Sequence, residues 1–351
     1  MNFADRIITW QRQHGRHQLP WQQTTDAYRI WLSEIMLQQT QVATVIPYYE
    51  KFIAHFPDVS VLAAAPIESV MQCWAGLGYY SRARNLHRCA QLVAGSHGGQ
   101  FPRQVEELAK LPGIGRSTAA AIAALAFGQR AAILDGNVRR VLARHCGIEG
   151  FPGHPQIERQ FWQRAESLLP VDQIETYTQG MMDLGATVCT RSRPNCAACP
   201  VNDTCVARNT HTIESLPTPR PVKVRPVRVQ TVLAMQDSSG AMLLEMRPPS
   251  GIWGGLLSLP EFESDASDES LVVEVGTRFG LDIAITETLG DIRHEFTHYT
   301  YLMRPKLAQV TGAIGAASAQ LRRVSGEGLK TAPLPAPVRR LLELVMNPAL
   351  V

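Results

Sequence analysis

Four cysteines that lie close together constrain the fold of this chain more than any other feature of its sequence. Cys189, Cys196, Cys199 and Cys205 fall within seventeen residues and are spaced C-x6-C-x2-C-x5-C. Thiolates this close together can surround one tetrahedral centre, either a zinc ion or an iron–sulfur cluster. A structural zinc site usually pairs two short C-x2-C turns, and this stretch contains one. The spacing therefore predicts a metal-holding loop and favours an iron–sulfur cluster over zinc.

The remaining cysteines and the overall composition are typical of an intracellular globular protein. Cys73, Cys89 and Cys146 are scattered among apolar residues, as buried small side chains are. The first residues lack the apolar core of a secretory signal, and the longest apolar run, Ala119 to Phe127, is too short to span a bilayer. With 45% hydrophobic and 19% charged residues, we expect a sizeable core. We also expect a cytoplasmic location and a monomeric state.

The first part of the chain has the periodicity of helices. Apolar residues recur three and four positions apart in residues 29–46, 61–74, 118–127 and 138–146. Glycine and proline separate these windows, and no comparable alternation of strands is present. The sequence up to about residue 210 therefore predicts an all-α domain.

The second part has a different texture. Residues 216–226 contain four prolines, which favours an extended connection between domains. Residues 227–235 and 241–247 are predicted as the strands of a hairpin, 271–279 as an amphipathic helix, and 296–303 as a further strand. The second domain is therefore predicted to be α+β. The predicted division is 1–215 for the helical domain, with the cysteine loop at about 189–205, then 216–226 for the linker and 227–346 for the second domain.

Basic residues are concentrated in one part of the helical domain. The formal net charge is only +3, yet the segment from Tyr80 to His145 holds ten basic and three acidic residues. Such an excess indicates a surface that binds phosphates, although a solvated helix face is the alternative. Within this segment Leu111-Pro112-Gly113-Ile114-Gly115 separates two predicted helices, and Arg116-Ser117 opens the second. Glycines and a free helix N-terminus can hold a phosphodiester, whereas the alternative is an ordinary turn.

Two carboxylates stand in environments that would tune them differently. Glu34 has Ile30, Trp31 and Leu37 as its helical neighbours. An apolar face raises the pKa of a carboxylic acid, which makes Glu34 a candidate proton donor. The alternative is a Glu that pairs with Arg29.

Asp135 precedes the predicted helix that begins near Val138. An ordinary N-cap is the alternative reading of this residue. The helix N-terminus favours the ionised carboxylate, so we expect Asp135 to be charged. One protonated and one charged carboxyl is the pattern of enzymes that cleave glycosidic bonds.

With these residues in place, the chain closely resembles adenine DNA glycosylases of the MutY kind, within the helix–hairpin–helix DNA glycosylase superfamily. The resemblance covers nearly the whole chain. It rests on the segments LSEIMLQQTQVATVIPYY, GLGYYSRARNLH, LPGIGRSTA, ILDGNVRRVLAR, MMDLGATVCTRSRPNC and RPPSGIWGG. It implies a two-lobed helical domain with a [4Fe–4S] cluster on the four cysteines, followed by a Nudix-like domain.

The resemblance implies a role for several residues. Glu34 would protonate adenine at N7. Asp135 would stabilise the sugar cation before water adds, either by its charge alone or through a covalent intermediate. The substrate would be double-stranded DNA with adenine opposite 8-oxoguanine or guanine, with the adenosine flipped into a pocket. The DNA-binding residues implied are Gln38, Gln39, Tyr79, Arg82, Gly113, Gly115, Ser117 and Asn137.

The second domain is expected to recognise the lesion rather than to hydrolyse nucleotides. The carboxylates of the Nudix pattern are broken, because Ser270 and Val273 stand where Glu is required. The family's Phe-Ser-His loop corresponds to Phe296, Thr297 and His298. These three residues are therefore predicted to contact 8-oxoguanine.

Two other activities compete with this prediction. Endonuclease III-like enzymes also cut the strand, using a Lys where this chain has Ser117, and Ser cannot form a Schiff base. A non-catalytic protein that binds damaged DNA would keep the hairpin and the cluster but would not need Glu34 and Asp135. The sequence thus predicts a monofunctional glycosylase of base excision repair.

Overall fold

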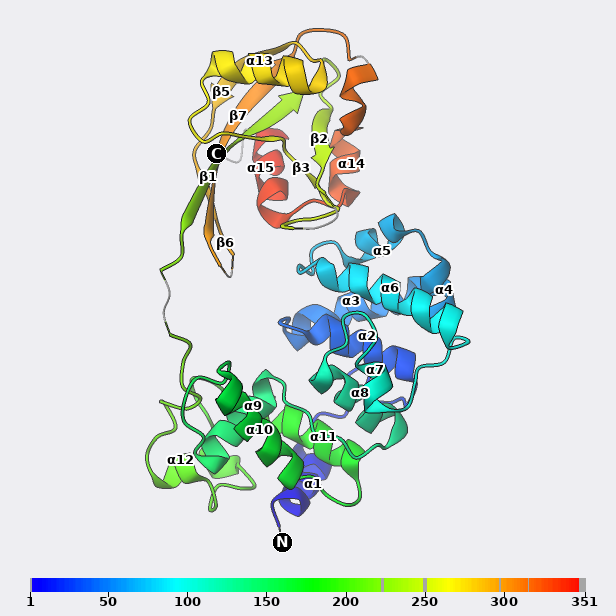
Figure 1. Ribbon diagram of the computed structural model, residues 1–351, viewed down its shortest axis with the longest axis vertical. Helices are drawn as coiled ribbons and strands as arrows, with labels where there is room; N and C mark the ends of the chain where they lie inside the picture. The colour runs from blue at the N-terminus through cyan, green and yellow to red at the C-terminus, as the bar shows by residue number, and fades with distance from the viewer. Residues whose placement is uncertain (1, 222–223, 249–250, 297, 315, 347–351) are drawn as a thin grey trace. The chain divides into compact units, whose positions relative to one another are not determined.

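The structure is a computed structural model, and it describes residues 2–221, 224–248, 251–296, 298–314 and 316–346 (Figure 1). The chain divides into two compact units. One comprises Met1–Val70 and Arg82–Val222, and the other comprises Met71–Ser81 and Lys223–Val351. None of the helices described is long and apolar enough to cross a membrane.

The chain before the Pro-rich segment is helical, as predicted (Figure 1). A π-helix, η1, joins the last long helix to the first cysteine of the loop. The 3-10 turn η2 begins at Cys196 and is followed directly by Cys199. The bounds are α1 Phe3–His14, α2 Ala27–Leu37, α3 Val42–His55, α4 Val59–Ala64, α5 Ile67–Trp74, α6 Ser81–Ser96, α7 Val105–Leu108, α8 Arg116–Phe127, α9 Gly136–Cys146, α10 Pro155–Ser167, α11 Ile174–Asp183, η1 Leu184–Val188, η2 Cys196–Ala198 and α12 Val206–Asn209.

The helices of the first unit form two groups. Helix α2 packs against α3 and α8, whereas α1 returns to pack against α11 beside α9 and α10. The core of the second group contains Ile7, Leu142, Phe161 and Leu184 and extends to the cysteine loop. Helices α8 and α11 contact each other, so the two groups meet there.

Two of the predicted helical windows are interrupted. In residues 29–46, α2 ends at Leu37 and α3 begins at Val42. Gln39 lies between them with a φ of 58°, a left-handed value that a right-handed helix cannot contain. In residues 61–74, Pro66 separates α4 from α5, because a proline disfavours helical backbone in the residue before it. The apolar spacing was correct, but periodicity alone does not show such breaks.

The second unit contains a mixed sheet with the order β3-β2-β1-β7-β5. Strands β1 and β7 are parallel, and the other pairs are antiparallel. The bounds are β1 Val227–Gln236, β2 Met242–Met246, β3 Leu257–Ser258, β4 Glu261–Phe262, α13 Asp268–Phe279, β5 Ile283–Thr288, β6 Ile292–Glu295, β7 Thr300–Val310, η3 Ala316–Gln320, β8 Leu321–Val324, α14 Gly326–Thr331 and α15 Ala336–Met346.

Alternate residues of β1 face two separate cores. Leu233 and Met235 pack with Phe279 of α13, whereas Val232 packs with Leu341 of α15. Successive side chains of a strand point to opposite faces, so α13 and α15 cover opposite sides of the sheet. Figure 1 shows the same layered arrangement.

The predicted hairpin and helix of the second domain are confirmed, and one predicted strand is shifted. Strands β1 and β2 pair as expected, and α13 includes residues 271–279. The strand predicted from residue 296 begins instead at Thr300. The Phe296 amide donates to the Tyr299 carbonyl at 2.9 Å, which closes a tight turn between β6 and β7. Phe296 and Tyr299 therefore close the hairpin between β6 and β7.

Candidate active site and cysteine loop

Glu34 lies on the wall of a cavity of about 490 Å³. Asp26 caps helix α2 by accepting from the Tyr28 amide at 2.9 Å, and Trp31 is fully buried on the same helix. The cavity has the size of a small-molecule site. Its other wall includes Gln179 and Met182 of α11 and the segment from Arg16 to Thr25.

Burial, and to a lesser extent the negative charge of Asp135, raises the pKa of Glu34 to about 8. A carboxyl with this pKa is largely protonated at neutral pH and can donate a proton. Arg29 forms an ion pair with Asp26 at 3.6 Å. Among the ion pairs of the described residues none involves Glu34, so the alternative pairing with Arg29 is wrong.

Asp135 is the N-cap of α9, as the alternative reading held, but it is also coupled to Glu34. Its Oδ1 accepts from the Val138 amide at 2.7 Å. Burial raises the pKa of Asp135 above its usual value, and the hydrogen bond from Val138 and the charge of Arg140 oppose that shift. The helix N-terminus acts in the expected direction, but the cost of desolvation is the larger effect. The two carboxyls do lie within electrostatic range of each other.

Asn137 and Arg140 connect Asp135 to the cysteine loop. The Asn137 amide lies 3.5 Å from Asp135 Oδ2, and its Oδ1 accepts from Arg140 at 2.8 Å. Arg140 also donates to the carbonyls of Cys189 at 2.6 Å and Gly185 at 2.5 Å. These contacts orient Asn137 inside the protein, and its predicted contact with DNA stays a prediction.

Ser117 holds the segment that leads to Asp135. Its Oγ accepts from the Leu134 amide at 2.9 Å, which ties the start of α8 to the residue before Asp135. From the sequence, Ser117 was a predicted DNA-binding residue, and it stood at the position where strand-cutting relatives have a lysine nucleophile. This positioning contact was not visible from the sequence, because it joins residues seventeen positions apart.

The hairpin before α8 has the geometry that a phosphate site requires. Gly113 has a φ of 79°, and a Cβ there would lie 2.9 Å from Asn85 Cβ. Gly115 is the N-cap of α8, has no side-chain cap, and faces open space where a Cβ would be. The first amides of this twelve-residue helix are thus available to an anion. Arg116 instead stacks on Trp162, 3.8 Å from the ring centroid.

Arg82 has a structural role that its sequence context did not reveal. It is 8% exposed, and its guanidinium donates to the carbonyls of Ile35, Met36 and Gln38 at 2.6 to 3.0 Å. It also donates to Thr40 Oγ1 at 3.1 Å. Arg82 therefore closes the C-terminal end of α2, which carries Glu34. Its contact with a phosphate stays a prediction, and these bonds do not support it.

Two residues predicted to probe DNA have unusual backbones. Gln39 and Tyr79 adopt φ values of 58° and 49°, which are rare for residues other than glycine. Tyr79 is 51% exposed despite its size. Left-handed backbone at large residues is strained and is concentrated at functional sites. Gln38 adds its carbonyl to the Arg82 cap.

The four predicted ligands converge. Cys189, Cys196, Cys199 and Cys205 line one small cavity beside Arg144. Arg144 is 3% exposed and donates to Thr190 O at 2.7 Å, while its other terminal nitrogen lies 3.0 Å from Arg191 O. Its Nη1 also lies 3.5 Å from Cys189 Sγ.

The chemistry of these four thiols suits a cluster. Burial raises the pKa of Cys199 to about 11, so its thiolate needs a bound cation to form at neutral pH. Within the described ranges, no three Cys, His, Asp or Glu side chains are arranged to hold a single metal ion. Four thiols around one small cavity are the ligand set of a zinc ion or of an iron–sulfur cluster, and the identity of the bound group stays a prediction.

In the second unit, Phe296 of the predicted lesion-recognition loop packs against other aromatic side chains. The Phe296 ring lies 5.5 Å from Trp253 and 5.0 Å from Tyr299, between centroids. His298 is exposed, and Thr297 lies outside the described residues. Glu261, a match to the Nudix pattern, pairs with Arg247 at 2.7 Å and accepts from the Tyr301 hydroxyl at 2.8 Å.

Sequence reasoning missed most of the cavity wall. Arg16 binds the fully buried Asp183 through its backbone amide at 2.9 Å and its Nε at 2.7 Å, and Gln179 donates to the same carboxylate. This pairing fixes the segment that carries Trp21 and Gln22 over the cavity. The one sequence signal for this contact was Asp183 itself, a charged residue within an apolar helical segment.

Comparisons with known proteins agree with this arrangement. Residues 32–167 match the HhH-GPD superfamily base excision DNA repair protein family, and residues 231–344 match the NUDIX domain family. The helical part resembles a thermostable thymine-DNA glycosylase with a TM-score of 0.53 and 29% identity, over 59% of this chain and 95% of that one. It shares the fold of an endonuclease III in a non-covalent DNA complex, with a TM-score of 0.50 and 22% identity, over 59% and 94% of the two chains. The fold is thus a helical HhH-GPD domain followed by a Nudix-like α+β domain.

Curated relatives match along most of the chain. An adenine DNA glycosylase of Buchnera aphidicola subsp. Acyrthosiphon pisum is 35% identical over 88% of this chain and 87% of that protein. The adenine DNA glycosylase of Homo sapiens is 36% identical over 84% of this chain and 65% of that protein. The chain therefore belongs to the adenine DNA glycosylases, base excision repair enzymes that hydrolyse N-glycosyl bonds.

Proposed function

We propose that this enzyme removes adenine opposite 8-oxoguanine or guanine in double-stranded DNA, by hydrolysis and without cutting the strand. The observation that carries this proposal is the coupled pair of carboxyls, Glu34 on the cavity and Asp135 at the start of α9. A damage-binding protein without catalysis would have no use for a carboxyl whose pKa is about 8. A single-turnover assay of adenine release from an A:8-oxoguanine duplex tests it.

Within this proposal each carboxyl carries out one step. The flipped base enters the cavity, and Glu34 transfers its proton to N7 of adenine as the glycosidic bond breaks. The bonding electrons leave with the base through N9, and the positive charge develops on the sugar. Asp135 stabilises that charge in its ionised form until water adds to C1′. The Glu34 carboxylate accepts a proton when the cycle closes.

The proposed cofactor is a [4Fe–4S] cluster held by Cys189, Cys196, Cys199 and Cys205. Within this proposal the cluster fixes the loop that Arg140 and Arg144 join to α9. Arg191 and Arg193, which lie among the ligands, present positive charge to DNA. The proposed boundaries are a glycosylase domain at 1–215, a linker at 216–226 and a lesion-recognition domain without nucleotide hydrolysis at 227–346. A monomeric state and a cytoplasmic location remain predictions.

The absence of strand cleavage is a direct prediction. Ser117 has no amine to form a Schiff base, so the product should be an intact abasic strand that breaks only on heating in alkali. Borohydride should trap little enzyme on DNA compared with a bifunctional lyase. Ser117→Lys loses the hydrogen bond from Leu134, so any gain in trapping should be accompanied by at least tenfold slower base release. Ser117→Ala is the matched control, because it loses the bond without gaining an amine. Efficient trapping of the wild type would contradict the proposal.

Recognition of 8-oxoguanine is proposed for the loop at 296–299. His298→Ala in the full chain should reduce the preference for A:8-oxoguanine over A:G by about ten- to a hundredfold, because one polar contact is worth about 1–3 kcal/mol. Adenine release from both duplexes measures the preference. His154→Ala is the control, since His154 is also exposed and makes no side-chain cap. Unchanged preference in His298→Ala would place lesion recognition elsewhere.

A further inference from the structure

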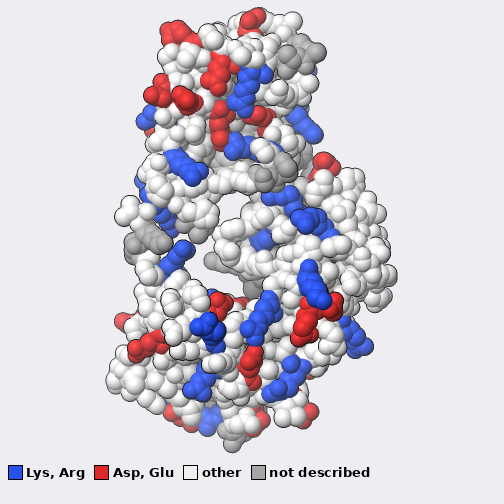
Figure 2. Space-filling model, viewed as in Figure 1, with Lys and Arg blue, Asp and Glu red and all other residues white. Residues whose placement is uncertain are grey.

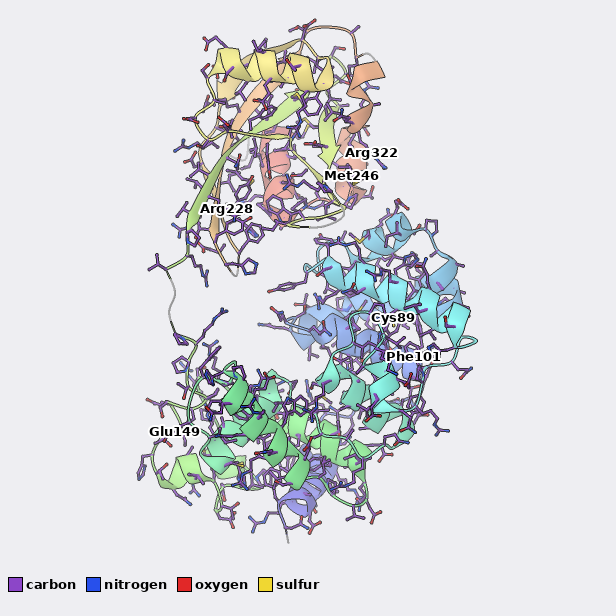
Figure 3. The ribbon with its side chains drawn as sticks, viewed as in Figure 1. Cys89, Phe101, Glu149, Arg228, Met246 and Arg322 are labelled. Carbon is purple, nitrogen blue, oxygen red and sulfur yellow. The ribbon has the colours of Figure 1, made fainter. Side chains whose placement is uncertain are left out.

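Arg228 is an exposed cation beside the hairpin loop of the second unit. It lies near the start of β1, in register with Tyr301 of the adjacent parallel strand β7. Its guanidinium carbon lies 4.5 Å from the centroid of the Tyr299 ring. Tyr299 is the last residue of the hairpin turn at 296–299. Figure 3 shows Arg228 at the end of the unit where β6 lies.

Tyr299, on whose ring Arg228 stacks, is held in place by burial and by neighbouring aromatic rings. It is 8% exposed, and its ring lies 5.0 Å from Phe296 and 6.4 Å from Tyr301, between centroids. A guanidinium stacked on an aromatic face keeps its N–H groups at its edge, where they can still bind an anion. Stacking also restricts the arginine before it binds, so less side-chain entropy is lost on binding.

The charge of Arg228 is not neutralised, unlike that of its neighbours. Arg225 and Arg293 both pair with Glu295, at 3.1 and 2.7 Å. Among the ion pairs of the described residues, none includes Arg228. Two arginines thus share the Glu295 carboxylate at this end of the unit, and Arg228 is a third arginine beside them. In Figure 2 acidic side chains gather instead over the end that bears α13.

We propose that Arg228, held over Tyr299, binds a DNA phosphate next to the base that the 296–299 hairpin reads. The inference rests on the proposed role of that hairpin. A planar guanidinium has several N–H groups that fit a phosphodiester oxygen pair, and most protein–DNA hydrogen bonds fix position through such contacts. The contact would orient the hairpin without reading sequence itself.

The experiment measures duplex affinity against salt. Full-length protein carrying Glu34→Gln, which should not release the base, is titrated with A:8-oxoguanine and A:G duplexes at several KCl concentrations. Adding Arg228→Gln should reduce the slope of log K against log salt by about 0.9. It should weaken the binding of both duplexes by the same factor. Arg228→Lys should keep the slope but lose part of the affinity. Arg322→Gln, at an exposed arginine on β8, is the matched control and should change neither. Thermal melting checks that the variants are folded.

The outcomes separate this proposal from the function on which it rests. If Arg228→Gln leaves the slope of log K against log salt unchanged, Arg228 binds no phosphate and the proposal is wrong. A partner protein with an acidic surface would then be the alternative ligand of Arg228. If the slope is unchanged while the preference for 8-oxoguanine falls, Arg228 only supports the hairpin, and the proposal is overturned. If the protein without the Arg228 substitution does not distinguish the two duplexes, lesion recognition by the hairpin fails, whatever the slopes show.

Discussion

Replacing Glu34 with Gln should abolish adenine release while duplex binding persists. Glu34 lies on the cavity, and burial keeps its carboxyl largely protonated at neutral pH. Gln has nearly the same shape but no proton to give to the leaving base. Loss of a general acid costs about 10²- to 10⁴-fold in rate, and a reaction that depends on leaving-group protonation should lie at or beyond the upper end. Single-turnover release from an A:8-oxoguanine duplex measures the effect.

The matched control is Glu175→Gln. Glu175 lines the same cavity from α11 but is exposed. Its substitution should change the rate by less than about threefold, since an exposed carboxyl is not held protonated. Near wild-type release by Glu34→Gln would remove Glu34 from the mechanism.

The pH dependence of release gives a second test of the same assignment. With a pKa of about 8, Glu34 loses its proton as the pH rises through 8, so the wild-type rate should fall there. At the acid end Asp135 must be ionised, and burial raises its pKa, so the rate should fall at a higher pH than an ordinary Asp would give. Residual activity in Glu34→Gln should lack the alkaline limb. A wild-type profile that is flat from pH 7 to 9 would contradict the raised pKa.

Local features of this fold could be read from the sequence. The helix starting after Asp135, the strands around the turn at 237–240 and α13 follow from caps, turn residues and apolar spacing, which act over a few positions. The convergence of the four cysteines was also predictable, because cysteines spaced this closely in a chain are typical of one metal-holding loop. The resemblance to known glycosylases added the pairing of Glu34 with Asp135, which spacing alone does not give.

Long-range contacts account for what could not be predicted. Arg82 looks like a phosphate ligand in its basic segment, yet it caps α2 more than forty positions earlier. The cavity wall depends on Arg16 and Asp183, which meet only after α1 packs on α11. The pKa of Asp135 followed burial rather than its helix N-terminus, and burial is a property of the whole fold. The fold likewise determines which arginines lie beside a carboxylate and which do not.

Replacing Cys199 with Ser should remove the cluster and most of the stability of the loop. The segment 190–200 is largely exposed and buries little apolar surface of its own. With the proposed cluster in place, its order would depend on that cluster and on Arg144, which donates to two of its carbonyls. Metal binding at such a loop contributes directly to folding, so losing one ligand should cost several kcal/mol. We expect Cys199→Ser to be colourless, poorly folded and at least 100-fold less able to release adenine.

Cys146→Ser is the matched control. Cys146 is a partly buried cysteine close enough to Cys205 for their charges to interact, and it is not one of the four proposed ligands. This variant should stay brown, with four irons and four sulfides per chain, and should keep its activity. Iron and sulfide analysis, visible absorption and circular dichroism of protein purified without oxygen measure all three properties. Stoichiometric zinc in wild-type protein, or full iron in Cys199→Ser, would overturn the iron–sulfur assignment. Iron loss with native circular dichroism and normal adenine release would instead show that the loop holds its shape unaided. In that case the contacts of Arg140 and Arg144, rather than the cluster, would keep α9 and Asp135 in place.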